Sequence, residues 1–296
     1  MRAYAALIGD LDQRTFLVTG ANTGIGRETA LALAGRGARV FVASRSEQKT
    51  RPVIDEIVAL AGSSAVEFLH PDLGDLGSVR ACADEFLRAG EPLHALINNA
   101  GLAGGRGVTE SGFELAFGTN YIGPFLLTAL LLERLREGAP ARIVNVASIG
   151  HYRAPGIDYK AVRRRTNSFT GFPEYCVSKL ANVLHAQELA RRLGDTDVTT
   201  YSLHPGSVAS DVWRRVPWPI RPLMTRNMLS PVEGARTSLY CATAPDVTGE
   251  SGHYYDNCRR AQASAVATPE LASELWERSI DWVGLPLEAN RWPGSR

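Results

Sequence analysis

Cysteine is scarce in this sequence: only four of its 296 residues are cysteines, and no two form a C-x-x-C pair. They are Cys82, Cys176, Cys241 and Cys258. Scattered cysteines of this kind indicate neither a zinc site nor a disulfide framework. We therefore expect no bound metal, and we expect a protein of the reducing cytoplasm.

An excess of charge of either sign is also missing. The chain has 32 Lys and Arg residues against 31 Asp and Glu, a formal net charge of +1. A general nucleic-acid binder would show a basic excess, as would a protein that anionic membranes attract. We expect neither kind of partner. With 45% hydrophobic and 21% charged residues, the composition is that of a globular protein, not a disordered one.

Long apolar segments are absent, with one exception. The first 13 residues carry Asp10 and Asp12 and no apolar run, so we expect neither a signal peptide nor a membrane anchor. Residues 115–132 contain no charge, and their length of 18 is near the lower limit for a membrane span. Because Asn120 and Pro124 interrupt this run, a helix buried in a soluble core fits it better.

What the sequence does contain is a regular alternation of short apolar runs with longer helical patterns. The predicted strands cover residues 15–19, 39–43, 66–70, 95–98, 142–147, 198–203 and 252–255. The predicted helices cover residues 25–36, 47–61, 76–88, 113–136, 174–193 and 232–241. This order predicts an α/β fold: a doubly wound parallel sheet, Rossmann-like, with about seven strands and helices on both faces. Its continuity favours one domain over residues 1–296.

A glycine-rich turn, TGANTGIG over residues 19–26, follows the first predicted strand directly. Such glycines let the backbone approach a pyrophosphate, which would lie on free N–H groups at the positive end of the next helix. The position after the first strand favours a dinucleotide site over a simple tight connection. The predicted cofactor contacts here are Gly20, Asn22, Thr23, Gly24, Ile25 and Gly26.

The end of the second predicted strand is expected to face the adenosine ribose. An NAD site usually has an acidic residue there, but Ser44 and Arg45 stand in its place, and Arg27 lies just behind the glycine turn. Two guanidiniums could pair with a 2′-phosphate, so NADP(H) is favoured. Glu47 is the counter-argument and keeps NAD(H) open, as does the alternative that both arginines are only solvated surface.

Tyr175 and Lys179 lie four residues apart on a predicted helix, and therefore on one face of it. The fifth predicted strand leads to Ser148, at the edge where open α/β sheets bind ligands. A nearby ammonium and an oxidised nicotinamide would lower the pKa of a tyrosine. Ser148 could then hold a substrate oxygen while Tyr175 moves its proton. This chemistry suits hydride transfer at a carbonyl or an alcohol.

Six ordered motifs resemble the short-chain dehydrogenase/reductase family over roughly residues 14–284. They are the turn at 19–26, NNAG at 98–101, Asn120, Ser148, YxxxK at 175–179 and HPG at 204–206. The resemblance implies that Tyr175 is the general acid/base and that Ser148 polarises the substrate. It also implies that Lys179 binds the nicotinamide ribose and lowers the pKa of the phenol, while Asn120 holds a water of the proton relay.

The same resemblance implies further cofactor contacts at both ends of the dinucleotide. At the adenosine end they are Asp72, Leu73 and Asn98, with Ala100 and Gly101 of the same motif as Asn98. At the nicotinamide end they are Pro205, Gly206 and Val208.

A closer resemblance is to the retinol-dehydrogenase-like branch of this family, and residues 120–128, 175–184, 233–238 and 251–255 carry it. Ser148 and Tyr175 are separated by 27 positions, which is long for the family and typical of this branch. We expect no counterpart of the membrane-anchoring N-terminal helix of many retinol dehydrogenases, so the resemblance by itself does not name a retinoid as the substrate.

Two segments with little regular pattern, 151–173 and 213–230, follow the fifth and sixth predicted strands and are candidate walls and lid of a substrate site. The second is rich in Trp and Pro, which favours a bulky apolar substrate. We expect an NADP(H)-dependent oxidoreductase that interconverts an alcohol and a carbonyl on a lipophilic small molecule.

Other functions fit the same residues. One is a tailoring ketoreductase of a biosynthetic pathway that acts on a polyketide-like or polycyclic ketone. Another is a non-catalytic dinucleotide-binding sensor, although the intact Ser148, Tyr175 and Lys179 disfavour it. A sugar-nucleotide epimerase would share the Tyr–Lys pair but favours a different glycine spacing. The family resemblance also implies a homo-oligomer paired through the helices within 115–132 and 174–193.

Overall fold

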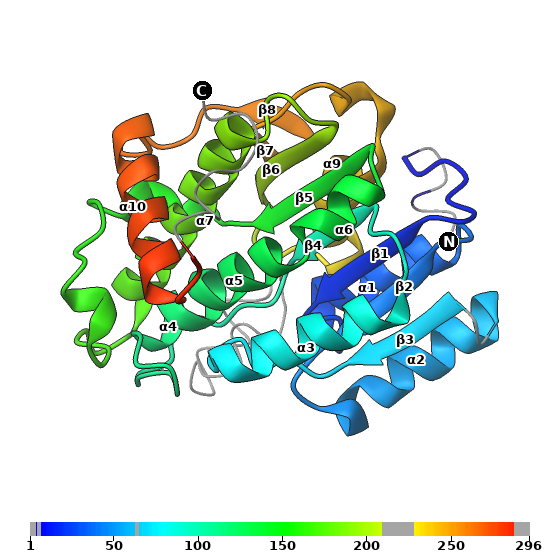
Figure 1. Ribbon diagram of the computed structural model, residues 1–296, viewed down its shortest axis with the longest axis horizontal. Coiled ribbons are helices and arrows are strands. Elements are labelled where there is room, and N and C mark those ends of the chain that lie inside the picture. Colours follow the sequence, from blue (N-terminus) through cyan, green and yellow to red (C-terminus); the bar gives the residue numbers. More distant parts are fainter. Residues whose placement is uncertain (1–3, 5–6, 63–64, 209–227, 287–296) are drawn as a thin grey trace.

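The computed structural model describes residues 4, 7–62, 65–208 and 228–286, and its centre is one sheet in the order β3-β2-β1-β4-β5-β6-β7-β8 (Figure 1). The strands are β1 (Thr15–Thr19), β2 (Arg39–Ala43), β3 (Val66–Leu69), β4 (Ala95–Asn98), β5 (Ala141–Val146), β6 (Val198–His204), β7 (His253–Asp256) and β8 (Arg259–Ala261). Strands β1 to β7 run parallel, and β8 is antiparallel to β7. The predicted doubly wound parallel fold is confirmed.

The described sheet has eight strands, where the sequence pattern predicts about seven. The additional strand is β8, which forms a hairpin with β7 through Asn257 and Cys258, both at positive φ. Strand β8 has three residues, and its two arginines are exposed. A strand this short, with no apolar run, gives no signal in the sequence.

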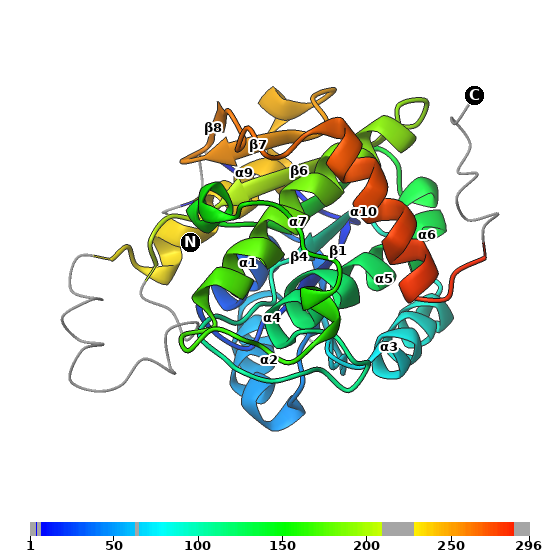
Figure 2. The ribbon, with the colours of Figure 1, turned by 90° about the vertical axis from the view of Figure 1, so that its left-hand side faces the viewer.

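Helices cover both faces of the sheet (Figures 1 and 2). They are α1 (Gly24–Ala34), α2 (Glu47–Ala61), α3 (Leu76–Ala89), α4 (Leu115–Phe117), α5 (Gly123–Leu130), α6 (Leu132–Glu137), α7 (Phe172–Arg192), α9 (Pro231–Thr243) and α10 (Pro269–Trp282). Phe16 and Val18 pack in one core with α1, α2 and α9, whereas Leu17 packs in the other with α3, α5, α7 and α10. Because both faces of β1 are buried, its sequence shows no alternation of apolar and polar residues.

The uncharged run at 115–132 is buried in the second of these cores, but the single long helix predicted over 113–136 is wrong. A π-helical turn, η3 (Gly118–Ile122), separates α4 from α5. The two glycines at its ends lie close to other segments: a Cβ on Gly118 would come 2.6 Å from Thr109 Cγ2, and one on Gly123 would come 2.2 Å from the Leu73 oxygen. Across the described residues, none of the helices combines the length and apolar character that a bilayer crossing needs.

Of the two segments proposed as walls and lid, the structure describes the first in full and the second only in part. Residues 151–173 are described and contain two short 3₁₀ turns, η4 (Ile149–Arg153) and η5 (Ala161–Arg163), before α7 begins. Of residues 213–230, positions 213–227 lie outside the described residues. Thr166, in the first segment, bonds to the Gly107 oxygen at 3.1 Å and to the carboxylate of Glu114. These contacts fix this segment against the loop before α4.

Candidate active site

A cavity of about 790 Å³ opens at the carboxyl ends of β1, β4, β5 and β6. Strand order reverses between β1 and β4, since β1 continues to β2 and β3 on one side while β4 continues to β5 on the other. Open α/β sheets bind ligands at such a switch point. Most of the candidate residues line this cavity.

The glycine turn forms one wall of the cavity, and its shape depends on the missing side chains. Gly20 has a φ of +67°, and a Cβ there would lie 2.8 Å from the Cα of Ala100. A Cβ on Gly26 would lie 2.3 Å from the Gly20 oxygen. The backbone of Thr23 is extended where α1 begins, so the first N–H groups of the helix face the cavity without intrahelical partners. This arrangement fits the pyrophosphate of a dinucleotide.

Thr19 connects this turn to the end of β4. Its hydroxyl oxygen accepts hydrogen bonds from the backbone N–H groups of Asn99 and Ala100, both at 3.0 Å. Asn99, Ala100 and Gly101 therefore line the cavity. Asn98 does not: its amide is buried beneath and donates to Thr128 Oγ1 and Asn145 Oδ1, both at 3.0 Å.

The adenosine end of the cavity is lined by residues that follow β2 and β3. Ser44, Arg45, Ser46 and Lys49 come from the first, and Pro71, Asp72 and Leu73 from the second. Lys49 is not among the residues predicted from the sequence, although a capping serine precedes it: Ser46 caps α2, and its Oγ accepts from the Lys49 N–H at 3.3 Å. Arg27 is not brought to the cavity, because its guanidinium pairs with Glu28 and Glu56.

Ser148, Tyr175 and Lys179 meet at the centre of the cavity. Ser148 Oγ accepts a hydrogen bond from the Gly150 N–H at 3.1 Å, and a Cβ on Gly150 would lie 3.4 Å from both Ser148 Oγ and Tyr175 Cε1. Lys179 Nζ donates to the Val146 oxygen at 2.8 Å and lies 5.7 Å from the centre of the Tyr175 ring. The end of β5 thus leads to Ser148, and helix α7 supplies both Tyr175 and Lys179.

Burial shifts the pKa values of Tyr175 and Lys179 in opposite directions, because it disfavours the charged form of each group. It raises the pKa of Tyr175 to about 12, and the hydrogen bond with Ser148 opposes that rise. It lowers the pKa of Lys179 to about 8. At neutral pH the cofactor-free site therefore holds Tyr175 as a neutral phenol and Lys179 as an ammonium. The phenol can donate a proton, and the ammonium places a positive charge near it.

Asn120 lies behind the cavity wall, in the π-helical turn. Its amide accepts from the Leu102 N–H at 2.9 Å and donates to the Leu102 oxygen at 3.0 Å and to Ser178 Oγ at 2.9 Å. Gly101 separates it from the cavity: a Cβ there would lie 3.3 Å from Asn120 Oδ1 and 3.4 Å from Lys179 Nζ. The π turn thus places Asn120 beside the same glycine that Lys179 approaches from α7.

The far end of the cavity is lined by His204 to Val208 after β6, which includes the predicted Pro205, Gly206 and Val208. Ile149 and Gly150 also line the cavity and were not predicted, whereas Arg153 and Phe172, which line it too, belong to the segment 151–173 that was expected to form a wall. Ile149 is 55% exposed, and the Phe172 ring is stacked on Tyr175 at 5.9 Å between centroids. Ile149 and Phe172 thus add apolar surface to the cavity that Ser148 and Tyr175 line.

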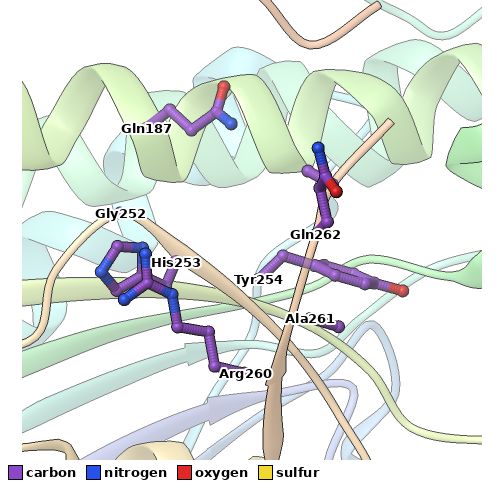
Figure 3. A pocket seen from close by; sticks show the side chains of 8 residues that line it. Gln187, Gly252, His253, Tyr254, Arg260, Ala261 and Gln262 are labelled. Carbon is purple, nitrogen blue, oxygen red and sulfur yellow. The ribbon is translucent and has the colours of Figure 1, made fainter. Parts of the chain in front are cut away.

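A second, more open cavity of about 490 Å³ lies between α7 and the β7–β8 hairpin (Figure 3). Gln187, His253, Arg260 and Gln262 surround it, with Tyr254 among them. It has neither a glycine cradle nor a Tyr–Lys pair. The first cavity is therefore the candidate active site.

Comparison with known proteins agrees with this geometry. A family profile described as short chain dehydrogenase matches residues 14–218. Retinol dehydrogenase 11 of Mus musculus is 44% identical over 94% of this chain and 89% of its own length, and retinol dehydrogenase 12 of Homo sapiens is 43% identical over the same shares. A crystal structure of an uncharacterized protein from Mycobacterium paratuberculosis has a TM-score of 0.76 and 32% identity, covering 95% of this chain and 97% of that one.

Proposed function

This chain belongs to the short-chain dehydrogenase family, and on that premise we propose that it uses NADP(H) to interconvert an alcohol and a carbonyl on a lipophilic small molecule. The family makes it an NAD(P)-dependent oxidoreductase. The observation that carries the proposal is the meeting of Ser148, Tyr175 and Lys179 in the same cavity as the glycine turn.

The residues present fit a dinucleotide. The cradle formed by Gly20 and Gly26 has no room for side chains, and the first turn of α1 offers its N–H groups to a pyrophosphate. When bound, the nicotinamide supplies or accepts the hydride. The residues from His204 to Val208 would hold that ring, and Lys179 would hold its ribose.

The proton is assigned to Tyr175. One lone pair of Ser148 Oγ is occupied by the Gly150 N–H, so the serine hydrogen is free to be donated to the substrate oxygen or to the Tyr175 oxygen. In reduction, Tyr175 gives its proton to the carbonyl oxygen; in oxidation, the phenolate takes the alcohol proton. The Lys179 ammonium favours the phenolate in that second direction.

NADP(H) is favoured by the charges at the adenosine end. Arg45 and Lys49 both line the cavity beside Ser44, and no carboxylate follows β2 on the lining. Glu47, the acidic candidate from the sequence, is not among the lining residues. Two cations, with no acidic residue after β2 on the lining, suit a 2′-phosphate, whereas a ribose 2′-hydroxyl is usually met by a carboxylate at that position.

A lipophilic substrate is supported by the rim of the cavity and by the names of the relatives. Ile149 and Phe172 offer apolar surface beside Ser148 and Tyr175. Several relatives are named retinol dehydrogenases. We propose that residues 151–173 form one wall of the substrate site.

The proposed function is tested by Tyr175→Phe, with Tyr240→Phe on α9 as the matched control. NADPH and NADH oxidation is measured with retinal, aliphatic aldehydes, steroid ketones and polycyclic ketones. Tyr175→Phe is expected to lower kcat by at least about 10²-fold, the contribution of a general acid, while the Kd for NADPH stays unchanged. Full turnover in Tyr175→Phe would refute the assignment, and a preference for polycyclic ketones would favour the tailoring ketoreductase.

A further inference from the structure

His151 is fully buried, three residues after Ser148, and the proposed reaction gives it no part. Its Nδ1 lies 2.7 Å from the backbone oxygen of Ser148, and its Nε2 lies 3.1 Å from the backbone nitrogen of Ser264. Ser264 follows β8 and is 113 residues further along the chain. The imidazole therefore joins the loop of the catalytic serine to the far edge of the sheet.

The two contacts fix the tautomer of the ring. The backbone N–H of Ser264 can only donate, so Nε2 accepts and carries no hydrogen. Nδ1 then carries the ring hydrogen and donates it to the Ser148 oxygen. A protonated ring would place an Nε2 hydrogen against the Ser264 N–H. Burial lowers the pKa of His151, which agrees with a neutral ring.

Ser148 is thereby held at both its peptide group and its side chain. Its backbone oxygen accepts from Nδ1 of His151 and also from the His151 N–H at 3.1 Å. Its Oγ accepts from the Gly150 N–H at 3.1 Å. The backbone bonds fix the plane of the peptide, and the third bond fixes the direction of the hydroxyl that faces Tyr175.

Aromatic rings and the segment after β8 support the imidazole. The ring centroid of His151 lies 3.9 Å from that of Tyr152 and 4.6 Å from that of Tyr254. The Tyr152 hydroxyl donates to the Gln262 oxygen at 2.5 Å. Tyr254 and Gln262 appear in Figure 3 at the second cavity. The β7–β8 edge, remote from the cofactor cradle, is thus connected to the catalytic serine.

We propose that His151 is a positioning residue for the reaction: its Nδ1–H sets the orientation of Ser148, and the Ser264 N–H holds the ring in place. This inference rests on the proposed function, because the benefit is a serine hydroxyl aimed at Tyr175 and the substrate oxygen.

Two amide substitutions separate the two contacts. His151→Asn keeps a donor near the position of Nδ1, and His151→Gln keeps an acceptor near the position of Nε2. We expect His151→Gln to lower kcat by about 10- to 100-fold, the scale of a small misplacement at a reacting group. His151→Asn should lower kcat by a clearly smaller factor, because it keeps the donor that faces the Ser148 oxygen. The Kd for NADPH should be the same in both variants, and so should the fall in Tm.

A second measurement needs no turnover. In the cofactor-free protein, ¹⁵N-edited NMR of the His151 ring should show the Nδ1–H tautomer. The same pair of substitutions at His253, whose side chain makes no hydrogen bond among the described residues, should leave kcat unchanged. Equal losses of kcat in His151→Asn and His151→Gln, or an Nε2–H tautomer, would overturn the inference. A Ser148→Ala variant with full turnover would instead overturn the proposed function, leaving the tautomer measurement as a separate test.

Discussion

Two cations, Arg45 and Lys49, reach the adenosine end of the cavity from different local structures. Arg45 follows the end of β2, whereas Lys49 lies in the first turn of α2, where the Ser46 cap fixes the direction of the helix. Arg27 lies nearby on α1, but its guanidinium contacts Glu56 Oε1 at 2.7 Å. A cation already paired with carboxylates is less available to a phosphate.

Arg45→Ala and Lys49→Ala should each weaken NADPH binding by about tenfold, since a hydrogen bond to a charged group contributes about 1.5–3 kcal/mol and this end is partly open to solvent. NADH binding should change little, because NADH has no 2′-phosphate. Fluorescence titration of both cofactors measures the two Kd values. Arg27→Ala is the control and should not separate NADPH from NADH; equal losses for the two cofactors at Arg45 and Lys49 would contradict the 2′-phosphate site.

At the scale of elements, α10 covers the outer side of α7 and reaches α5 (Figure 2). The Trp276 ring lies 4.9 Å from that of Phe125, and the Arg192 guanidinium lies 4.7 Å from Trp276. The Tyr121 hydroxyl is 2.8 Å from Ser279 Oγ. Helix α10 thus covers part of the surface of α5 and α7 that the family resemblance assigns to subunit pairing. Pairing through α5 and α7 would therefore have to use the parts of these helices that α10 leaves uncovered.

Trp276→Ala should lower the free energy of unfolding by about 3–5 kcal/mol, because a fully buried tryptophan leaves a cavity between α10, α7 and α5. Trp282→Ala, in the same helix but only partly buried, should cost less. Urea denaturation of both variants measures the difference. Equal losses of the free energy of unfolding in the two variants would mean that the packing of α10 on α7 and α5 does not depend specifically on Trp276.

For the whole molecule, the burial of Lys179 makes the free energy of unfolding depend on pH. Its pKa is about 8 in the folded protein, against 10.5 for an ordinary lysine. Between these values the unfolded chain binds the proton and the folded chain does not, so the free energy of unfolding rises with pH. Tyr175, with its pKa raised to about 12, lowers stability only above about pH 10.

Lys179→Met removes this dependence. Its stability advantage over the native chain should be largest below about pH 8 and should shrink by about 2–3 kcal/mol by pH 10, at 1.36 kcal/mol per pKa unit. Urea denaturation of the two proteins at both pH values gives the difference, in which the other titrating groups cancel. An advantage that is constant with pH would mean that Lys179 keeps its ordinary pKa when folded.

The extent of the domain stays a prediction that the sheet supports. Strands from Thr15 to Ala261 form one continuous sheet, and α10 returns to pack on α7. The described residues show how far the alternation of strand and helix continues beyond the part matched by the family profile. We propose that all 296 residues form one domain.

Local order along the chain is enough to predict the fold class, the glycine turn and the set of Ser148, Tyr175 and Lys179. These depend on local order: strand, glycine turn and helix follow one another, and four residues along a helix return to one face. The strand boundaries follow for the same reason, because both faces are buried and each strand is an apolar run. The short β8 strand and the π turn at 118–122 have no such local signal.

Which neighbours of these motifs face the cavity depends instead on tertiary packing. Asn98 and Asn99 are adjacent and alike, yet the first is bonded beneath the sheet edge and the second lines the site. The pairing of Arg27 with Glu56 and the bond from Ser264 to His151 join segments far apart in the chain. Such contacts depend on how distant elements pack, and spacing along one chain carries no information about them.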